Sequence, residues 1–292
     1  MIPKEILKQV RRIQITTSRM VTDVFAGQYQ SVFKGSGMEF DEVREYQPGD
    51  EIRSIDWNVT ARTGHPYVKK FVEERELTVM LLLDMSLSCS FGTAKQLKSR
   101  LAAEICSILA FSAIQNNDRV GLIIFTDRIE KFVPPRKGLS HVLRVIREAL
   151  YFKPKGSGTN IKAALEYLGK VTTRKTVTFI ISDFYNPAFK KDLSITNKRH
   201  DTIAVTITDP LEIELPNIGI IKLDDPETGE SRLIDTSSAG LRKDYHKNSL
   251  QRFQERKKLF QSINVDSIDI RTDIPYSKTL IAFFKMRERR MH

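Results

Sequence analysis

The strongest signal in the hydrophobic pattern is a run of seven residues, Leu77 to Leu83, in which only Thr78 is polar. A run of this length is too short to cross a membrane and suits a strand that is buried on both faces of a sheet. The run stops at Asp84, and Ser86 and Ser88 follow at alternate positions. Open α/β sheets bind ligands at the carboxyl ends of their parallel strands, so these three side chains are candidates for a binding site.

Beyond this run, strand-like apolar segments alternate with amphipathic helical segments. Such alternation predicts an α/β domain with a doubly wound, mainly parallel sheet that has one antiparallel edge strand. A short strand that is ended by Pro134 and Pro135 is expected at an edge of the sheet. The predicted strands are 77–83, 119–125, 129–133, 176–182, 202–207 and 267–271, and the predicted helices are 93–117, 139–151, 161–171, 187–198, 240–262 and 277–290.

Two segments depart from this alternation. Residues 218–223 and 231–235 flank a Pro-Glu-Thr-Gly turn, which predicts a β-hairpin insertion near 211–236. Before the first buried strand, glycine and proline punctuate two short strand-like runs, 39–46 and 67–72, and a helix is predicted for 3–28. We therefore expect a small β-rich N-terminal module at 1–76 and an α/β domain at 77–292.

The N-terminal module is expected to have a small core, anchored by the only tryptophan, and ion pairs around it. The expected core residues are Phe40, Val43, Tyr46, Ile52, Ile55 and Trp57. The expected ion-pairing residues are Arg44, Asp50, Arg53, Asp56 and Arg62. The arginines of this set could instead hold the acidic face of a partner.

Composition limits the classes of function. Lys and Arg outnumber Asp and Glu by 47 to 36, an excess that would favour nucleic acid, an anionic membrane or an acidic protein. The excess is spread along the chain, so a solvated basic surface is the simpler interpretation, and no nucleic-acid partner is expected. The two cysteines and five histidines show no zinc-type spacing. Without a signal-peptide core or an apolar run of about 20 residues, the chain is predicted to be cytoplasmic and to have no membrane span.

Two further polar side chains are expected near Asp84. Asp183 follows the strand predicted at 176–182, and Thr159 precedes a helix behind a glycine-rich loop. Loops at the carboxyl ends of parallel strands meet at one edge of the sheet, which would bring two carboxylates and three hydroxyls together. Such an all-oxygen set is typical of Mg²⁺ or Mn²⁺. The predicted metal ligands are Asp84, Ser86, Ser88, Thr159 and Asp183.

The order Asp-x-Ser-x-Ser, Gly-Thr-Asn before a helix, and Ser-Asp after a strand resembles a von Willebrand factor A-type domain. In such domains the matching residues form a metal-ion-dependent adhesion site. The resemblance implies that Ser86 and Ser88 bind the metal directly and that Thr159 binds according to ligand state. It implies that Asp84 and Asp183 act mainly through water or hydrogen bonds, and that an open position takes an acidic residue of a partner. Phe184 departs from the usual pattern, in which glycine follows the aspartate.

Motifs before the first buried strand resemble a narrower family, the bacterial domain-of-unknown-function family fifty-eight, which joins such a segment to a von Willebrand A-like domain. These motifs are Gly35-x-Gly37, Phe40, Arg44-Glu45-Tyr46, Pro48-Gly49-Asp50, Arg53, Ile55-Asp56-Trp57 and Ala61-Arg62. Family genes commonly neighbour those of MoxR-type AAA+ ATPases, which implies such an ATPase as a partner. The resulting hypothesis is a non-enzymatic, metal-dependent protein-binding adaptor in a chaperone-like or assembly complex.

Other functions remain open at this point. A Mg²⁺-dependent phosphohydrolase could use the same Asp and Ser residues, although such enzymes usually need more carboxylates. A basic nucleic-acid-binding protein would use the positive charge. The loop Gly156 to Asn160 is glycine-rich like a phosphate-binding loop, but it lacks the GxxxxGK[ST] spacing. Ser86 and Ser88 lack the GxSxG setting of a hydrolase nucleophile.

Overall fold

The computed structural model describes residues 39–72, 76–92, 97–185, 187–224 and 231–291. Contacts between residues divide the chain into two compact units. One unit contains the described residues from Glu39 to Leu77, and the other contains those from Thr78 to Met291. The helix predicted for 3–28 lies outside the described residues.

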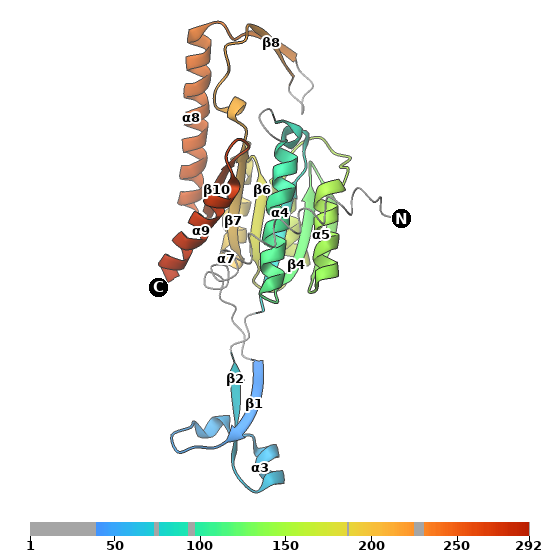
Figure 1. Ribbon diagram of the computed structural model, residues 1–292, viewed down its shortest axis with the longest axis vertical. Coiled ribbons are helices and arrows are strands. Elements are labelled where there is room, and N and C mark those ends of the chain that lie inside the picture. The colour runs from blue at the N-terminus through green and yellow to red at the C-terminus, as the bar shows by residue number, and fades with distance from the viewer. Residues whose placement is uncertain (1–38, 73–75, 93–96, 186, 225–230, 292) are drawn as a thin grey trace. The chain divides into compact units, whose positions relative to one another are not determined.

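The smaller unit is an antiparallel strand pair with a short helix in its connection (Figure 1). The helix begins after Asp56, whose carboxylate accepts two backbone N–H bonds from the first turn, and it ends at Gly64, where φ is 77°. Both strands lie where the hydrophobic pattern predicts them, whereas the helix was not predicted. The elements are β1 (Glu39–Glu45), η2 (Ile52–Ser54), α3 (Trp57–Thr63) and β2 (Tyr67–Val72).

The core expected for this unit forms only in part. Ile52 and Trp57 are 67% and 66% exposed, so the prediction that they are core residues is wrong. Val68 is buried, and Val43, Tyr46 and Ile55 are half-buried. A strand pair with one short helix offers too little apolar surface to cover an indole ring as well. Burial of Phe40 lies outside what the structure describes.

The ion pairs expected for this unit also form in part. Arg44 and Asp50 form one, with Nη2 of the arginine 2.6 Å from Oδ1 of the aspartate. Asp56 caps α3. Arg53 and Arg62 are exposed.

The larger unit is built on a six-stranded sheet with the order β10-β7-β6-β3-β4-β5. Five strands are parallel, and β5 pairs antiparallel with β4 at one edge. The apolar run forms the central strand β3, in which every residue from Val79 to Asp84 is buried. The predicted doubly wound, mainly parallel sheet with an antiparallel edge strand is therefore confirmed. The strands are β3 (Thr78–Asp84), β4 (Arg119–Phe125), β5 (Ile129–Arg136), β6 (Val177–Ser182), β7 (Asp201–Thr208) and β10 (Asp266–Arg271).

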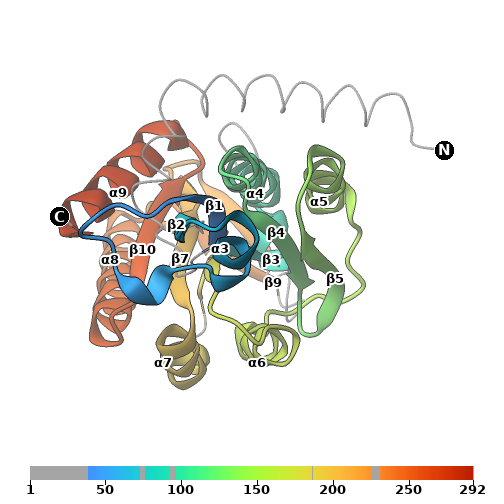
Figure 2. The same ribbon diagram turned by 90° about the horizontal axis from the view of Figure 1, so that it is seen from below.

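Helices cover both faces of this sheet (Figure 2). Helices α4, α5 and α9 lie on one face, and α6, α7 and α8 lie on the other. On the second face Met80, Leu82 and Phe125 of the strands pack with Leu165 of α6 and Leu193 of α7. The helices are α4 (Lys98–Gln115), α5 (Leu139–Tyr151), α6 (Ile161–Val171), α7 (Lys190–Arg199), α8 (Ala239–Ser262) and α9 (Tyr276–Met291).

Among the boundaries that differ from the predicted ones, those of α4 and β5 bear on the site and on the edge of the sheet. Helix α4 begins at Lys98 rather than at residue 93, and residues 93–96 are outside the described ranges. Strand β5 continues through Pro134 and Pro135 to Arg136 instead of stopping before them, as an edge strand can do because its outer side needs no N–H donors.

A separate β-hairpin lies between β7 and α8 in the chain (Figure 1). Its strands β8 (Ile220–Asp224) and β9 (Ser231–Asp235) pair antiparallel with each other and form a sheet of their own. A short helical turn, η5 (Pro210–Glu212), precedes it. Ser238 caps α8, because its Oγ accepts the Leu241 N–H at 3.3 Å. None of the helices in the described ranges has the length and apolar character of a membrane-spanning segment.

Candidate functional site

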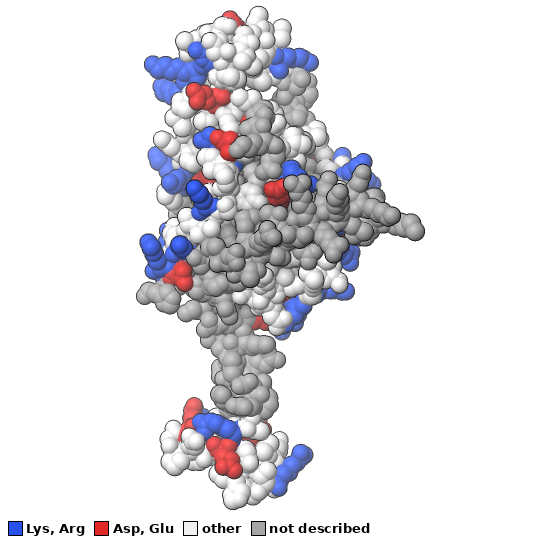
Figure 3. Space-filling model, in the orientation of Figure 1, with Lys and Arg blue, Asp and Glu red and all other residues white. Residues whose placement is uncertain are grey.

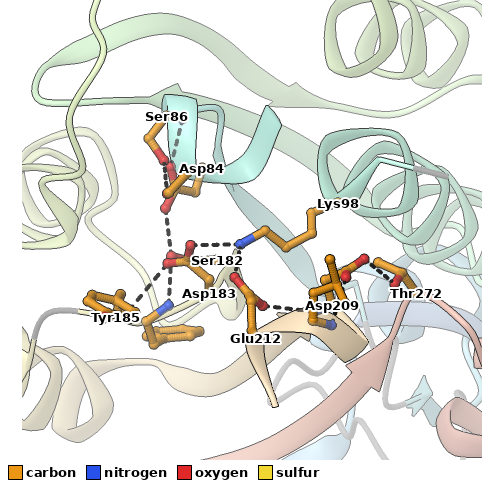
Figure 4. A network of polar contacts seen from close by, with 12 residues as sticks. Asp84, Ser86, Lys98, Ser182, Asp183, Tyr185, Asp209, Glu212 and Thr272 are labelled. Carbon is orange, nitrogen blue, oxygen red and sulfur yellow. Dashed lines mark hydrogen bonds and ion pairs between the residues drawn. The ribbon is translucent and has the colours of Figure 1, made fainter. Parts of the chain in front are cut away.

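Asp84 ends β3 and is completely buried. Its Oδ1 accepts a hydrogen bond from Ser86 N at 2.9 Å, and its Oδ2 accepts one from Ser182 Oγ at 2.6 Å (Figure 4). Burial and then the charge of nearby Asp183 raise the pKa of Asp84 to about 6, against the opposing effect of these hydrogen bonds. The end of the central strand therefore carries a carboxylate whose hydrogen-bond donors in the described part of the chain are neutral.

Ser86 and Ser88 present two hydroxyls next to this carboxylate. Their Oγ atoms lie 2.9 Å apart. Ser86 is completely buried and Ser88 is half-buried. The chain turns here into η3 (Leu87–Ser90), with Cys89 N bonded to Ser86 O at 3.1 Å, and this turn keeps the two alternate side chains together. Hydroxyl oxygens are hard donors, so this pair could hold a divalent cation.

The loop that carries Thr159 lies against the same segment. Leu87 N donates to Ser157 O at 2.9 Å, which ties the loop to the turn after β3. Asn160 ends the loop as the cap of α6, where its side chain accepts the Ala163 N–H. Thr159 is half-buried between these two anchor points. The glycine-rich loop is thus brought to the carboxyl end of β3, as expected from the order of elements.

Asp183 follows β6 and forms an ion pair that the sequence did not indicate. Lys98 Nζ lies 3.1 Å from Asp183 Oδ2 and 2.6 Å from Glu212 Oε1, and only 2% of the lysine side chain is exposed. Tyr185 N donates to Asp183 Oδ1 at 3.3 Å. Burial acts to lower the pKa of Lys98, but the charges of Asp183 and Glu212 raise it above its ordinary value. The candidate site therefore contains a fixed ammonium group (Figure 4).

The polar network extends from Glu212 toward the far strand of the sheet. Asp209 N donates to Glu212 Oε2 at 2.8 Å, and Thr272 Oγ1 donates to Asp209 Oδ2 at 2.8 Å (Figure 4). Asp209 follows β7 and Thr272 follows β10, so the network joins the carboxyl ends of three parallel strands to the start of α4. The residues Asp-Pro-Leu-Glu, 209–212, have the pattern of a capping box, which can be recognised in a sequence. The contacts of Asp209 with Thr272 and of Glu212 with Lys98 cannot be recognised in this way.

Phe184 shows how the chain departs from the adhesion-domain pattern. Its φ is +53°, a left-handed conformation that glycine adopts easily and that is uncommon for phenylalanine. Its ring is buried, with edge-on contacts to Phe189 and Phe260 at centroid distances of 5.3 and 5.2 Å. The aromatic packing offsets the backbone strain, and Asp183 keeps its position at the strand end.

Comparisons with known proteins agree with this architecture. Residues 42–255 match a family described as protein of unknown function DUF58. The uncharacterized proteins Mb1516 of Mycobacterium bovis and Rv1480 of Mycobacterium tuberculosis are each 30% identical over 283 residues, covering 96% of this chain and 89% of theirs. An aerotolerance-related membrane protein from Bacteroides fragilis is similar in fold, with a TM-score of 0.50 and 15% identity over 74% of this chain and 100% of that chain. The chain therefore belongs to the DUF58 family of proteins of unknown function.

Proposed function

We propose that this protein is a non-enzymatic, metal-dependent adaptor that binds an acidic residue of a protein partner. The observation that carries the proposal is the pair of Ser86 and Ser88 hydroxyls, 2.9 Å apart, beside the buried carboxylate of Asp84. The von Willebrand A-like fold supports it, because parallel sheets of this kind bind ligands at the edge where these residues lie.

The donor set fits Mg²⁺ or Mn²⁺, which prefer hard oxygen ligands. Ser86, Ser88 and Thr159 would supply hydroxyl oxygens, and Asp84 and Asp183 would supply negative charge through water or hydrogen bonds. The raised pKa of Asp84 supports this assignment, because it reflects a buried charge that a cation would stabilise. The bound cation would supply positive charge toward an incoming carboxylate.

Two features favour binding over catalysis. A cation held largely by neutral hydroxyls keeps most of its positive charge, which suits capture of a carboxylate. In addition, Lys98 bonds both Asp183 and Glu212, so each carboxylate already has a cationic partner, which disfavours a role as general base for a phosphohydrolase.

The candidate partner comes from the family resemblance, which points to a MoxR-type AAA+ ATPase. A nucleic-acid partner is less well supported. Among the described residues on the face drawn in Figure 3, Lys and Arg side chains are scattered and are interspersed with Asp and Glu.

A capture experiment tests the proposal. The full chain is immobilised and exposed to lysate and to a purified MoxR-type ATPase, in Mg²⁺ and in EDTA. We expect capture of the ATPase by the wild type in Mg²⁺, and loss of capture in EDTA and with Asp84→Ala. Asp244→Ala, which removes an exposed carboxylate on α8, is the matched control and should bind like the wild type.

Circular dichroism would verify that each variant is folded. Capture that is indifferent to EDTA would contradict the proposal. Turnover of a phosphoester with Mn²⁺, if Asp183→Ala abolishes it, would favour the phosphohydrolase instead.

A further inference from the structure

A cavity of about 450 Å³ lies beside the candidate site, between the loop after β6, the end of β7, η5 and α8. Its lining includes the apolar side chains of Phe189, Ile207 and Leu259. Asp183 and Tyr185 belong to both the cavity wall and the candidate site. A partner that is bound at the candidate site would therefore lie next to this cavity.

Arg256 lines the cavity without forming an ion pair in the described part of the chain. Its Nη1 donates to the backbone oxygen of Asp183 at 2.9 Å, and its guanidinium lies 5.4 Å from the centroid of the Phe253 ring. Burial lowers the pKa of Arg256, against the attraction of the carboxylates of Asp269, Asp183 and Glu212. A partly buried positive charge with no bonded carboxylate favours an anionic ligand.

Arg252 lies one helical turn before Arg256 and lines the same cavity. Its guanidinium donates to the Tyr185 hydroxyl and to Ser249 Oγ, and it stacks on the Tyr185 ring at 5.3 Å from the centroid. Tyr185 is 71% exposed, so the Arg–Tyr pair is accessible at the rim of the cavity. Exposed arginine and tyrosine side chains next to a pocket are typical of residues that dominate protein interfaces.

In the described part of the chain, no carboxylate of the cavity wall is hydrogen-bonded to these arginines, although Asp183 and Glu212 attract Arg256. Glu212 and Asp183 are bonded to Lys98, and Glu255 is exposed and accepts a hydrogen bond from Gln251 Nε2 at 2.9 Å. Within the described ranges, the guanidinium groups of the cavity therefore have neutral hydrogen-bond acceptors only. Their positive charge is available to a ligand.

We infer that this cavity is a second anchor for the protein partner and binds an apolar side chain that carries, or lies next to, a carboxylate. This inference rests on the proposed function for the identification of the ligand as a protein. Arginine binds carboxylates through two parallel hydrogen bonds, and the apolar lining accommodates the hydrocarbon part. The partner segment is thus expected to have one acidic residue for the cation and an apolar residue with a second carboxylate for the cavity.

Small probes test the cavity without the metal. In EDTA, isothermal titration calorimetry on the full chain compares 4-phenylbutyrate, its neutral analogue 4-phenylbutanol, and inorganic phosphate. We expect phenylbutyrate to bind about tenfold more tightly than phenylbutanol, and phosphate alone to bind more weakly than phenylbutyrate. Arg256→Met should remove the advantage of the acid over the alcohol, and Arg252→Met should reduce it while leaving Asp183 O bonded to Arg256.

Lys258→Met is the matched control, because Lys258 is exposed on the same helix and does not line the cavity. Equal affinities for the acid and the alcohol, or an advantage of the acid that survives both arginine substitutions, would overturn the inference. Phosphate that binds more tightly than phenylbutyrate would overturn it in favour of a phosphorylated ligand. Because EDTA is present throughout, failure here is distinguishable from failure of metal-dependent capture.

Discussion

The Nζ of Lys98 lies 3.1 Å from Oδ2 of Asp183, so a lysine at the start of α4 forms a buried ion pair with a residue at the end of β6. The ammonium neutralises part of the negative charge of the candidate site. Repulsion between the ammonium and a divalent cation would weaken the proposed metal binding, but it would also leave a metal-bound site more positive toward a carboxylate.

Lys98→Met should lower the stability of the metal-free protein and increase the stabilisation that Mg²⁺ provides. Without metal, Asp183 and Glu212 lose their shared cation, and the free energy of unfolding should fall by about 3 kcal/mol, as for other broken buried ion pairs. Mg²⁺ should then stabilise the variant more than it stabilises the wild type, because the competing charge is gone. Urea denaturation with and without Mg²⁺ measures both effects.

The control for this substitution is Lys162→Met, which removes an exposed lysine that lies 3.8 Å from Glu166. Its effect on stability should be small. Equal stabilisation of wild type and Lys98→Met by Mg²⁺ would show that the ammonium and the metal do not compete.

Stabilisation by Mg²⁺ should depend on pH through Asp84. The pKa of this group is raised to about 6 in the folded chain from 3.8. Without a cation, the contribution of Asp84 to the free energy of unfolding is greatest below about pH 4 and is lost as the pH rises through about 6. The two limits differ by about 3 kcal/mol. A cation binds the ionised form, so the rise in Tm caused by Mg²⁺ should be large at about pH 7 and small at about pH 5. In Asp84→Asn, Mg²⁺ should raise Tm little at either pH. If Mg²⁺ raises the Tm of the wild type equally at both pH values, Asp84 is not the group that controls the effect.

Gly156→Ala should disturb the loop that carries Thr159. A Cβ at Gly156 would lie 1.8 Å from Asp127 Oδ1 and 2.2 Å from Thr126 Oγ1, so these side chains or the loop itself must shift. We expect the free energy of unfolding to fall by about 2 kcal/mol and the affinity for Mg²⁺ to fall with it. Gly158→Ala is the matched control, because a Cβ there would meet Asp127 Cβ at 3.7 Å, an ordinary van der Waals distance. Similar losses in both variants would contradict the steric explanation.

Tryptophan fluorescence should report on the smaller unit alone. Trp57 is the only tryptophan of the chain and is 66% exposed. Its emission should therefore be that of an indole in water and should be quenched readily by iodide. Trp57→Ala should change stability by less than about 0.5 kcal/mol. A blue-shifted, unquenched emission would show that this side chain is covered.

Much of the sheet could be predicted because the sequences of its central strands are compatible with few other structures. β3 and β4 are continuous apolar runs between polar residues, and such runs fit only a strand that is covered on both faces. The same pattern located Asp84, Ser86 and Ser88, since ligand sites lie where these strands end. The metal itself stays a prediction, which the capture and pH experiments would test.

The rest depended on contacts that are distant in the sequence. Lys98 lies 85 residues from Asp183 and 114 from Glu212, and a lysine in an amphipathic helix ordinarily indicates a solvent-facing position. Arg256 likewise lies in a helix, α8, where a charged side chain ordinarily indicates a solvent-facing position. Helix α3 was missed because it has only seven residues and is defined by its caps instead of an apolar stripe. Trp57 was misplaced because a large apolar residue was assumed to have enough structure around it to be buried.

The edge strand β5 has a consequence for assembly. It includes Pro134 and Pro135, which have no N–H to offer to a further strand. The opposite edge strand, β10, contains the charged residues Asp266, Asp269 and Arg271. Both edges of this sheet therefore disfavour pairing with a further strand, so strand-to-strand addition between copies of the protein is discouraged at this sheet.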